Sequence, residues 1–248
     1  DVLGSRGLGD VYKRQELVIE SGAFANCSSL TSITLPARMG ELEIGNESLG
    51  TVYGVDLFNG SIYLENIFVE EGNKYYSSVD GVLCDATGTT IIHYPNGRRG
   101  EYIVGNRITA IASYAFSGHR LSSVVFHSGV SSIGENAFYG CYNLESITFK
   151  GGLLPAELTV GENAFSFAYQ NDALTEVIFE AGSNVVEIGK GAFANNVGLT
   201  TIEIPNTVKK IGESAFANCS LLKNVTLVSG GAGLVIGNYA FQNCIALE

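Results

Sequence analysis

The chain has 248 residues, of which 46% are hydrophobic and 16% charged, and this composition supports a folded core and argues against a disordered protein. Its formal net charge of −11 argues against nucleic acid as a partner, because the longest basic run is only Arg98-Arg99. Polar residues and a group of glycines interrupt the uncharged stretch 224–247, so we expect no membrane insertion within this chain.

The N-terminal segment differs in character from the rest of the chain. Residues 5–15 read Ser-Arg-Gly-Leu-Gly-Asp-Val-Tyr-Lys-Arg-Gln, which resembles one translated frame of a widely used sequencing adapter. We therefore interpret residues 1–15 as an adapter-derived tail that is not native, and the alternative is a natural basic arm. Under this interpretation, the absence of a recognisable signal peptide says nothing about where the protein is located.

An Ala-Phe pair recurs along the remaining residues, and from Phe116 onward the steps between copies are 22 to 28 residues. A unit of about this length with small loop insertions is typical of a solenoid, in which similar repeats stack on one another. Ser48-Leu49 is a weaker copy of the pair. The seven clear copies end at Phe24, Phe116, Phe138, Phe165, Phe193, Phe216 and Phe241.

Each copy contains two apolar stretches. The first has the pattern Leu-x-x-Ile-x-Phe, and the period of two in its last residues predicts a strand. The second has the pattern Val-x-x-Ile-Gly-x-x-Ala-Phe, as in residues 130–138, and predicts a short strand followed by a single helical turn. Glu20 and Ala112 replace the glycine in two copies, and a position with positive φ rarely accepts either residue. The glycine therefore indicates close backbone packing.

One repeat cannot bury its own apolar face, but stacked repeats can. We expect the first strands to form one parallel sheet with strands about 4.8 Å apart, and the phenylalanine rings to form a continuous buried column. Residues 16–248 should thus be a single solenoid of about eight units. An irregular unit near 61–107 interrupts it, in which Val82–Cys84 and Ile91–Tyr94 flank a glycine-containing loop and predict a hairpin.

The pattern L-x-x-I-x-I-P-x-x-V-x-x-I-G-x-x-A-F-x-x-C resembles the BspA-like class of leucine-rich repeats, and Val208–Cys219 matches its second half almost throughout. The resemblance covers residues 16–49 and 108–248. Residues 61–107 also resemble an irregular unit of this family, through 76–83 and 92–95. It implies a leucine-rich-repeat solenoid of the α/β horseshoe class, rich in stacked parallel strands with short helical turns. The chain ends just after Leu247 opens a new repeat, so we expect truncation at both ends.

No group of residues predicts catalysis, a metal site or a cofactor. Four cysteines occupy one repeat position without zinc-ligand spacing, and stacking separates them too widely for a disulfide, so we expect free buried thiols. The segment 84–89, Cys-Asp-Ala-Thr-Gly-Thr, resembles the aspartyl-phosphate motif of P-type ATPases, but Ala86 replaces the lysine and a hairpin turn is favoured. The four repeat-position cysteines are Cys27, Cys141, Cys219 and Cys244.

The resemblance implies a cell-surface or extracellular adhesion module whose partner is a host or matrix protein or a glycan. The alternatives are a structural spacer in a larger surface protein and an accessory region of a secreted enzyme. The candidate ligand face is the outward side of the first strands, which is rich in hydroxyl and β-branched side chains and poor in charge. An equally open interpretation is that such residues are simply favoured in exposed strands. The predicted outward row is Thr34, Val125, Thr148, Ile178, Glu203 and Thr226.

Overall fold

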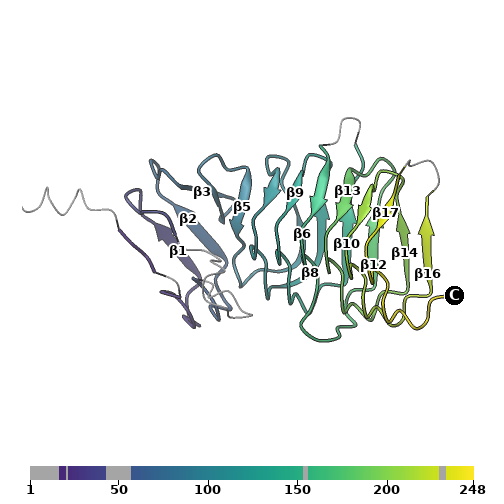
Figure 1. Ribbon diagram of the computed structural model, residues 1–248. Helices are drawn as coiled ribbons and strands as arrows, with labels where there is room; N and C mark the ends of the chain where they lie inside the picture. Colours follow the sequence, from purple (N-terminus) through teal and green to yellow (C-terminus); the bar gives the residue numbers. More distant parts are fainter. Residues whose placement is uncertain (1–16, 21, 43–56, 153–155, 229–232) are drawn as a thin grey trace, which may run out of the picture.

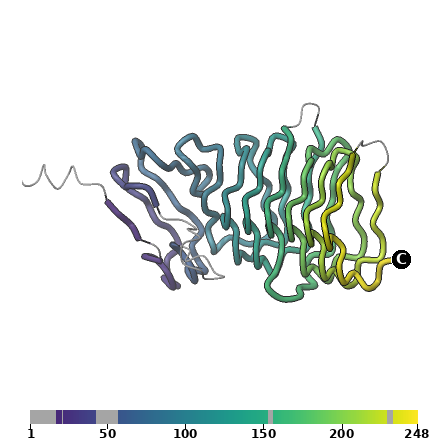
Figure 2. Tube along the Cα trace, viewed as in Figure 1, coloured from purple at the N-terminus to yellow at the C-terminus, as the bar shows by residue number. Residues whose placement is uncertain are grey.

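The computed structural model describes residues 17–20, 22–42, 57–152, 156–228 and 233–248 (Figure 1). The tail expected at residues 1–15 and the weak copy at Ser48-Leu49 lie outside the described residues. The described chain is a β-solenoid in which successive turns of backbone stack along one axis, from the purple N-terminal end to the yellow C-terminal end (Figure 2). This confirms the stack of parallel strands that the repeat pattern predicts.

One side of the solenoid is a single sheet with the strand order β17-β15-β13-β11-β9-β7-β5-β4-β3. Neighbours pair in parallel from β5 to β17, whereas β3, β4 and β5 pair antiparallel and form the expected hairpin of the irregular unit. The bounds are β3 Tyr76–Val79, β4 Val82–Asp85, β5 Thr90–His93, β7 Ala110–Ile111, β9 Ser132–Ile133, β11 Leu158–Val160, β13 Val185–Ile188, β15 Lys210–Ile211 and β17 Val235–Ile236.

The opposite side carries the strands of the Leu-x-x-Ile-x-Phe pattern, and it is divided into three hydrogen-bonded sheets. The expectation of one continuous sheet is therefore wrong on this side. The sheets are β1 Ser32–Leu35 with β2 Asn66–Val69; then β6 Arg99–Ile103, β8 Arg120–Phe126, β10 Ser146–Phe149 and β12 Glu176–Phe179; then β14 Thr201–Ile204 with β16 Asn224–Leu227.

The segment between the short strand and the phenylalanine differs from the expected helical turn. The described residues contain strands and turns and no helix. In one copy, Asn136 has a φ of 53°, a left-handed conformation that ends a right-handed helical turn. The backbone N–H groups here also donate sideways to the next repeat, as from Phe138 to the carbonyl oxygen of Ala164 at 2.7 Å. The stack, and not a helix, satisfies these groups.

The aromatic column is buried from Phe116 to Phe216, as predicted, whereas the end rings Phe24 and Phe241 are only partly buried, and no ring stacking is found in the described part of the chain between the Phe24 end and the rest of the column. The rings of Phe138 and Phe165 stack with centroids 4.9 Å apart, and the spacing from Phe193 to Phe216 is 5.3 Å. The described structure adds two members that lack the Ala-Phe pair. Phe58 stacks on Phe24 at 5.7 Å, and Tyr94 stacks on Phe116 at 4.6 Å.

The recurrent glycine lies where neighbouring backbones touch, as the sequence indicated. A Cβ atom at Gly161 would lie 2.6 Å from the carbonyl oxygen of Ile133, and one at Gly212 would lie 2.5 Å from the carbonyl carbon of Gly189. Neither glycine has a positive φ, so a side chain is excluded by space and not by backbone conformation. This close approach holds the repeats in register.

Candidate binding surface

The outward row keeps its predicted orientation, but its six residues fall into three groups. The register of β8, β10 and β12 aligns Val125, Thr148 and Ile178 on neighbouring strands. Glu203 and Thr226 pair across β14 and β16, and Thr34 lies on β1, far along the stack. The structure therefore brings together three of the six in one sheet, two in another and one apart.

Two exposed apolar residues extend this row, and the repeat pattern did not reveal them. Ile103 on β6 pairs with Val125, and its side chain is 61% exposed. Phe68 on β2 pairs with Thr34 and is 46% exposed. Both lie in strands outside the clear Ala-Phe copies. Residues 66–69 and 101–104 read Asn-Ile-Phe-Val and Glu-Tyr-Ile-Val, and such short runs of β-branched and aromatic residues are the sequence signal that could have located them.

The absence of backbone pairing between β12 and β14 coincides with a proline at the end of β14. In the pairs β8–β10 and β10–β12, the residue after the later strand donates its N–H to the last carbonyl of the earlier strand, as Lys150 does to Phe126 and Glu180 does to Phe149, both at 2.9 Å. The corresponding donor for Phe179 would be Pro205, which has no N–H. A proline directly after β14 thus removes one rung of the ladder.

An insertion before β12 accompanies the proline. Phe165 and Leu174 are nine positions apart, whereas Phe193 and Leu199 in the next copy are six apart. The longer segment contacts the next repeat, because the N–H of Asn171 donates to the carbonyl oxygen of Asn195 at 2.9 Å. The start of β12 is therefore fixed by the insertion, and β12 has its only ladder partner among the described strands in β10.

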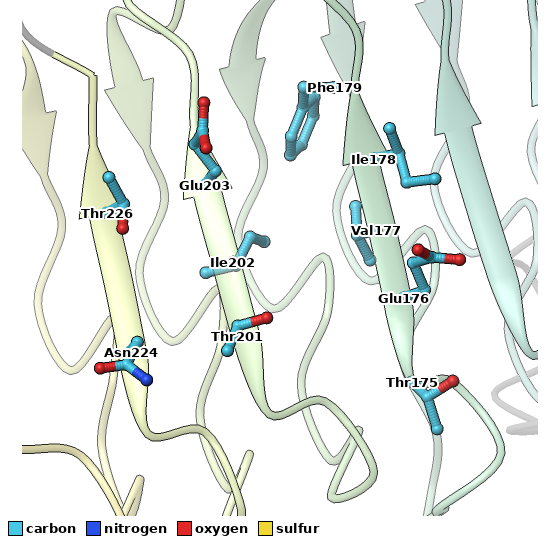
Figure 3. Close-up of a pocket in the computed structure, with 10 residues that line it drawn as sticks. All are labelled: Thr175, Glu176, Val177, Ile178, Phe179, Thr201, Ile202, Glu203, Asn224 and Thr226. Carbon is cyan, nitrogen blue, oxygen red and sulfur yellow. The ribbon is translucent and has the colours of Figure 1, made fainter.

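A groove of about 580 Å³ runs along this break, and we call it the β12–β14 groove. Val177, Phe179 and Ile202 are the inward-facing apolar residues of its lining, and of these only Phe179 is partly exposed (Figure 3). Its rim carries the carboxylates of Glu176 and Glu203 together with threonine hydroxyls. Three members of the predicted outward row line this groove, namely Ile178, Glu203 and Thr226.

The comparisons with known proteins agree with this architecture. A family model described as the BspA type leucine rich repeat region matches residues 13–50, 101–181 and 158–248, which is more than half of the chain. The chain belongs to this BspA-type family. The irregular unit with its hairpin falls mostly between the matched segments, in keeping with its different strand pairing. No curated protein sequence matches the chain.

Several solved structures resemble this BspA-type chain. The pneumococcal vaccine antigen PcpA is 26% identical with a TM-score of 0.60, over 88% of this chain and 50% of that one. A leucine rich cell surface protein from Faecalibacterium prausnitzii is 26% identical with a TM-score of 0.56, over 93% and 50%. A leucine-rich repeat protein from Bacteroides ovatus, at 24% identity and a TM-score of 0.58 over 93% and 51%, shows the same fold. The chain thus spans about half the length of these structures.

The cysteine position of the BspA-type repeat is a hydrogen-bond position. The thiol of Cys141 donates to the carbonyl oxygen of Phe116 at 3.0 Å, and Cys244 donates to that of Phe216 at 3.2 Å. Asn196 occupies the same position in another copy and donates to the carbonyl oxygen of Phe165 at 3.0 Å. Where this position is buried, cysteine and asparagine thus make the same hydrogen bond, whereas Ala168 in the Phe165 copy is exposed and has no side-chain donor.

The thiols are free, and burial lowers the reactivity of those in the core. All five cysteines are unpaired, as expected, and all but Cys27 are buried. Burial raises the pKa of Cys141 and of Cys219 to about 12, so the nucleophilic thiolate is scarce at neutral pH. Within the described residues, no group of three or more metal-ligating side chains is arranged to hold an ion, and no helix is long and apolar enough to cross a membrane.

The segment that resembles a phosphorylation motif is a structural turn. The carboxylate of Asp85 accepts hydrogen bonds from the N–H groups of Thr89 and Thr90 at 2.8 and 2.9 Å and from the hydroxyl of Thr87 at 2.6 Å. Partial burial opposes ionisation of Asp85, but these hydrogen bonds outweigh it and lower its pKa. The carboxylate is thus engaged in closing the hairpin between β4 and β5.

A second, smaller cavity of about 340 Å³ lies at the irregular unit beside Tyr75 and Tyr76. The hydroxyl of Tyr76 accepts a hydrogen bond from the N–H of Leu42 at 2.9 Å, and burial raises the pKa of this tyrosine. This hydrogen bond of Tyr76 therefore links the irregular unit to the N-terminal repeat. Of these two cavities, the β12–β14 groove is the larger.

Proposed function

We propose that this chain is a non-catalytic binding module of a bacterial cell-surface protein, and that it recognises a protein or a glycan through the outward side of β6, β8, β10, β12, β14 and β16. Membership of the BspA-type family and the similarity to a pneumococcal antigen and to a bacterial cell surface protein support this proposal. An extracellular or surface location is part of the same proposal.

The observation that carries the proposal is the β12–β14 groove. A spacer needs only a continuous ladder, because regular pairing satisfies every strand edge. Here the ladder is interrupted in the middle of the outward side, and the opening is lined by two glutamates, by threonines and by the partly exposed ring of Phe179. A concave site with apolar walls and a few polar groups is typical of ligand recognition.

The test measures binding of the whole chain to panels of extracellular matrix proteins and surface glycans. A Thr148→Lys/Ile178→Lys double variant places two charges on the outward row beside the groove and should lower the affinity for any ligand found at least tenfold. A matched control, Ser132→Lys/Thr159→Lys, places the same charges on exposed positions of the nine-stranded sheet and should leave the affinity unchanged.

Three results would contradict the proposal. Equal loss in both double variants would indicate a general charge effect. Unchanged binding in the outward variant would move the site elsewhere, with the cavity at Tyr75 and Tyr76 as the next candidate. The absence of any ligand across both panels would favour the spacer role, in which the chain holds another domain away from the cell surface.

A further inference from the structure

We propose that residues 96–98 act as a clamp that holds the N-terminal end of the solenoid on the rest of the stack, and that release of this clamp lets that end open as one unit while the regular repeats stay folded. The clamp follows the hairpin of the irregular unit and leads into β6. The part that it holds, which we call the N-terminal unit, comprises the described residues 17–20, 22–42 and 57–69 with strands β1 and β2. Such a joint is independent of the binding surface on the outward side.

The N-terminal unit has a hydrophobic core of its own. The buried apolar side chains of the described residues form two clusters, and one of them contains Leu35, Phe58 and Ile67 of this unit. On β4, Leu83 belongs to this cluster, whereas its neighbour Val82 belongs to the other, because successive residues of a strand face opposite sides. The hairpin is therefore a wall with one core on each face.

The backbone pairing also changes at this wall. β1 and β2 pair in parallel as a two-stranded sheet that includes no other described strand, whereas one ladder runs without interruption from β5 to β17. Individual hydrogen bonds cross the boundary instead. The N–H of Ile67 donates to the carbonyl oxygen of Gly81 at 2.8 Å, and the N–H of Leu42 donates to the hydroxyl of Tyr76 at 2.9 Å.

The clamp adds a compact set of such contacts. The Nδ2 atom of Asn96 donates to the carbonyl oxygen of Phe58 at 2.9 Å, and the N–H of Gly97 donates to that of Leu64 at 2.7 Å. A Cβ atom at Gly97 would lie 2.5 Å from the carbonyl carbon of Tyr63, so the two backbones meet with room for glycine only. The clamp is thus fitted closely to the backbone of the N-terminal unit.

Arg98 joins the N-terminal unit, the hairpin and the main core. Its Nε atom donates to the carbonyl oxygen of Glu65 at 2.6 Å, and its Nη2 atom donates to that of Asp80, in the hairpin turn, at 2.6 Å. The guanidinium also lies over the ring of Tyr94, 5.7 Å from its centroid, and this ring stacks on Phe116 in the main core. Several donors in a fixed plane, together with a flat face that packs on an aromatic ring, suit arginine to this role.

Loss of the clamp should act first on the N-terminal unit. In a solenoid each repeat contacts mainly its neighbours, so a weakened junction lets one end open at a lower free energy than the whole chain needs to unfold. The regular repeats keep their stacked rings and their ladder when the unit opens. The joint is therefore a conformational feature of the irregular unit.

The experiment is hydrogen exchange of the whole chain at pH 7, followed by mass spectrometry. In the wild type, residues 57–69 should exchange faster as a group than residues 132–211. Arg98→Met should speed exchange of residues 57–69 at least about tenfold and leave residues 132–211 unchanged. The matched control is Arg107→Met, because the guanidinium of Arg107 also donates to a backbone carbonyl, that of Thr87 at 2.5 Å, but outside the N-terminal unit. It should leave residues 57–69 unchanged.

Gly97→Ala is a second variant, which keeps every charge and donor but forces the two backbones apart, and it should give the same regional pattern as Arg98→Met. Unchanged exchange of residues 57–69 in both clamp variants would overturn the proposal. So would a uniform rise along the whole chain, or global unfolding of both variants, because the regular repeats are expected to stay folded without the clamp. An equal effect of Arg107→Met on residues 57–69 would point to a general effect of charge and would also overturn it.

Discussion

The aromatic column gives the sharpest test of how this solenoid is held together, and Phe138 is its best probe. The side chain is fully buried, and its ring stacks at 4.5 Å on Phe116 and at 4.9 Å on Phe165, with the edge of Phe126 at 5.8 Å. Replacement by alanine leaves a cavity walled by three rings that repeat stacking holds in place. The expected loss is about 3–5 kcal/mol of unfolding free energy, as for other buried aromatic residues.

Phe241 provides the matched control within the same column. Its ring stacks on only one neighbour, Phe216 at 5.3 Å, and it is only partly buried at the last described repeat. Phe241→Ala should therefore cost about 1–2 kcal/mol, in proportion to the smaller apolar area removed from contact. The conservative Phe138→Leu substitution, which keeps an apolar side chain in the column, should cost less than the change to alanine.

The assay is equilibrium urea denaturation followed by far-ultraviolet circular dichroism, since the chain contains no tryptophan to report by fluorescence. Repeats contact mainly their neighbours, so hydrogen exchange should accompany it to show which repeats open. A loss at Phe138 below about 1 kcal/mol, or one no larger than at Phe241, would refute the view that two-sided ring stacking carries the core.

Three other contacts can be tested in the same way. Gly161→Ala should lower the unfolding free energy by about 1–3 kcal/mol because its new Cβ meets backbone at 2.6 Å, whereas Gly105→Ala, with no atom within 4 Å, should change it by less than about 0.5 kcal/mol in the same urea titration. Asp85→Asn should lower the melting temperature at pH 7. The pKa of Asp85 is lowered in the folded protein, so the stabilisation by its carboxylate is present above the ordinary value of 3.8 and is lost as the pH falls through the folded pKa. The melting temperatures of the wild type and the variant, measured from pH 7 to pH 2, should therefore converge only at the acid end. A constant difference between them would contradict this. Cys141 and Cys219 should resist iodoacetamide at pH 8 in the folded protein and react in 6 M guanidinium chloride, as mass spectrometry of digests would show; rapid labelling of the native protein would refute their burial.

The sequence alone determined those features that each repeat encodes locally. Period-two alternation in residues 146–149 determined which side chains point inward, because successive residues of a strand face opposite sides. The recurrence of the Ala-Phe pair identified the buried column, and the tolerance of Glu20 and Ala112 at the glycine position distinguished close packing from a left-handed turn. The shared position of the cysteines indicated free thiols. Such features repeat with the unit, so one chain contains several independent instances of each.

The tertiary structure decided what depends on how one repeat is placed on the next. Phe58 joins the column although its own segment does not match the pattern, because the N–H of Phe24 donates to the carbonyl oxygen of Leu57 at 3.0 Å and so places the two rings side by side. The break between β12 and β14 depends on the insertion after Phe165 and on Pro205 acting together, and the repeat pattern treats the first as a loop and the second as an ordinary consensus residue. Lateral pairing is a relation between strands distant in sequence, so local periodicity predicts each strand and its faces but not whether two neighbours share a ladder.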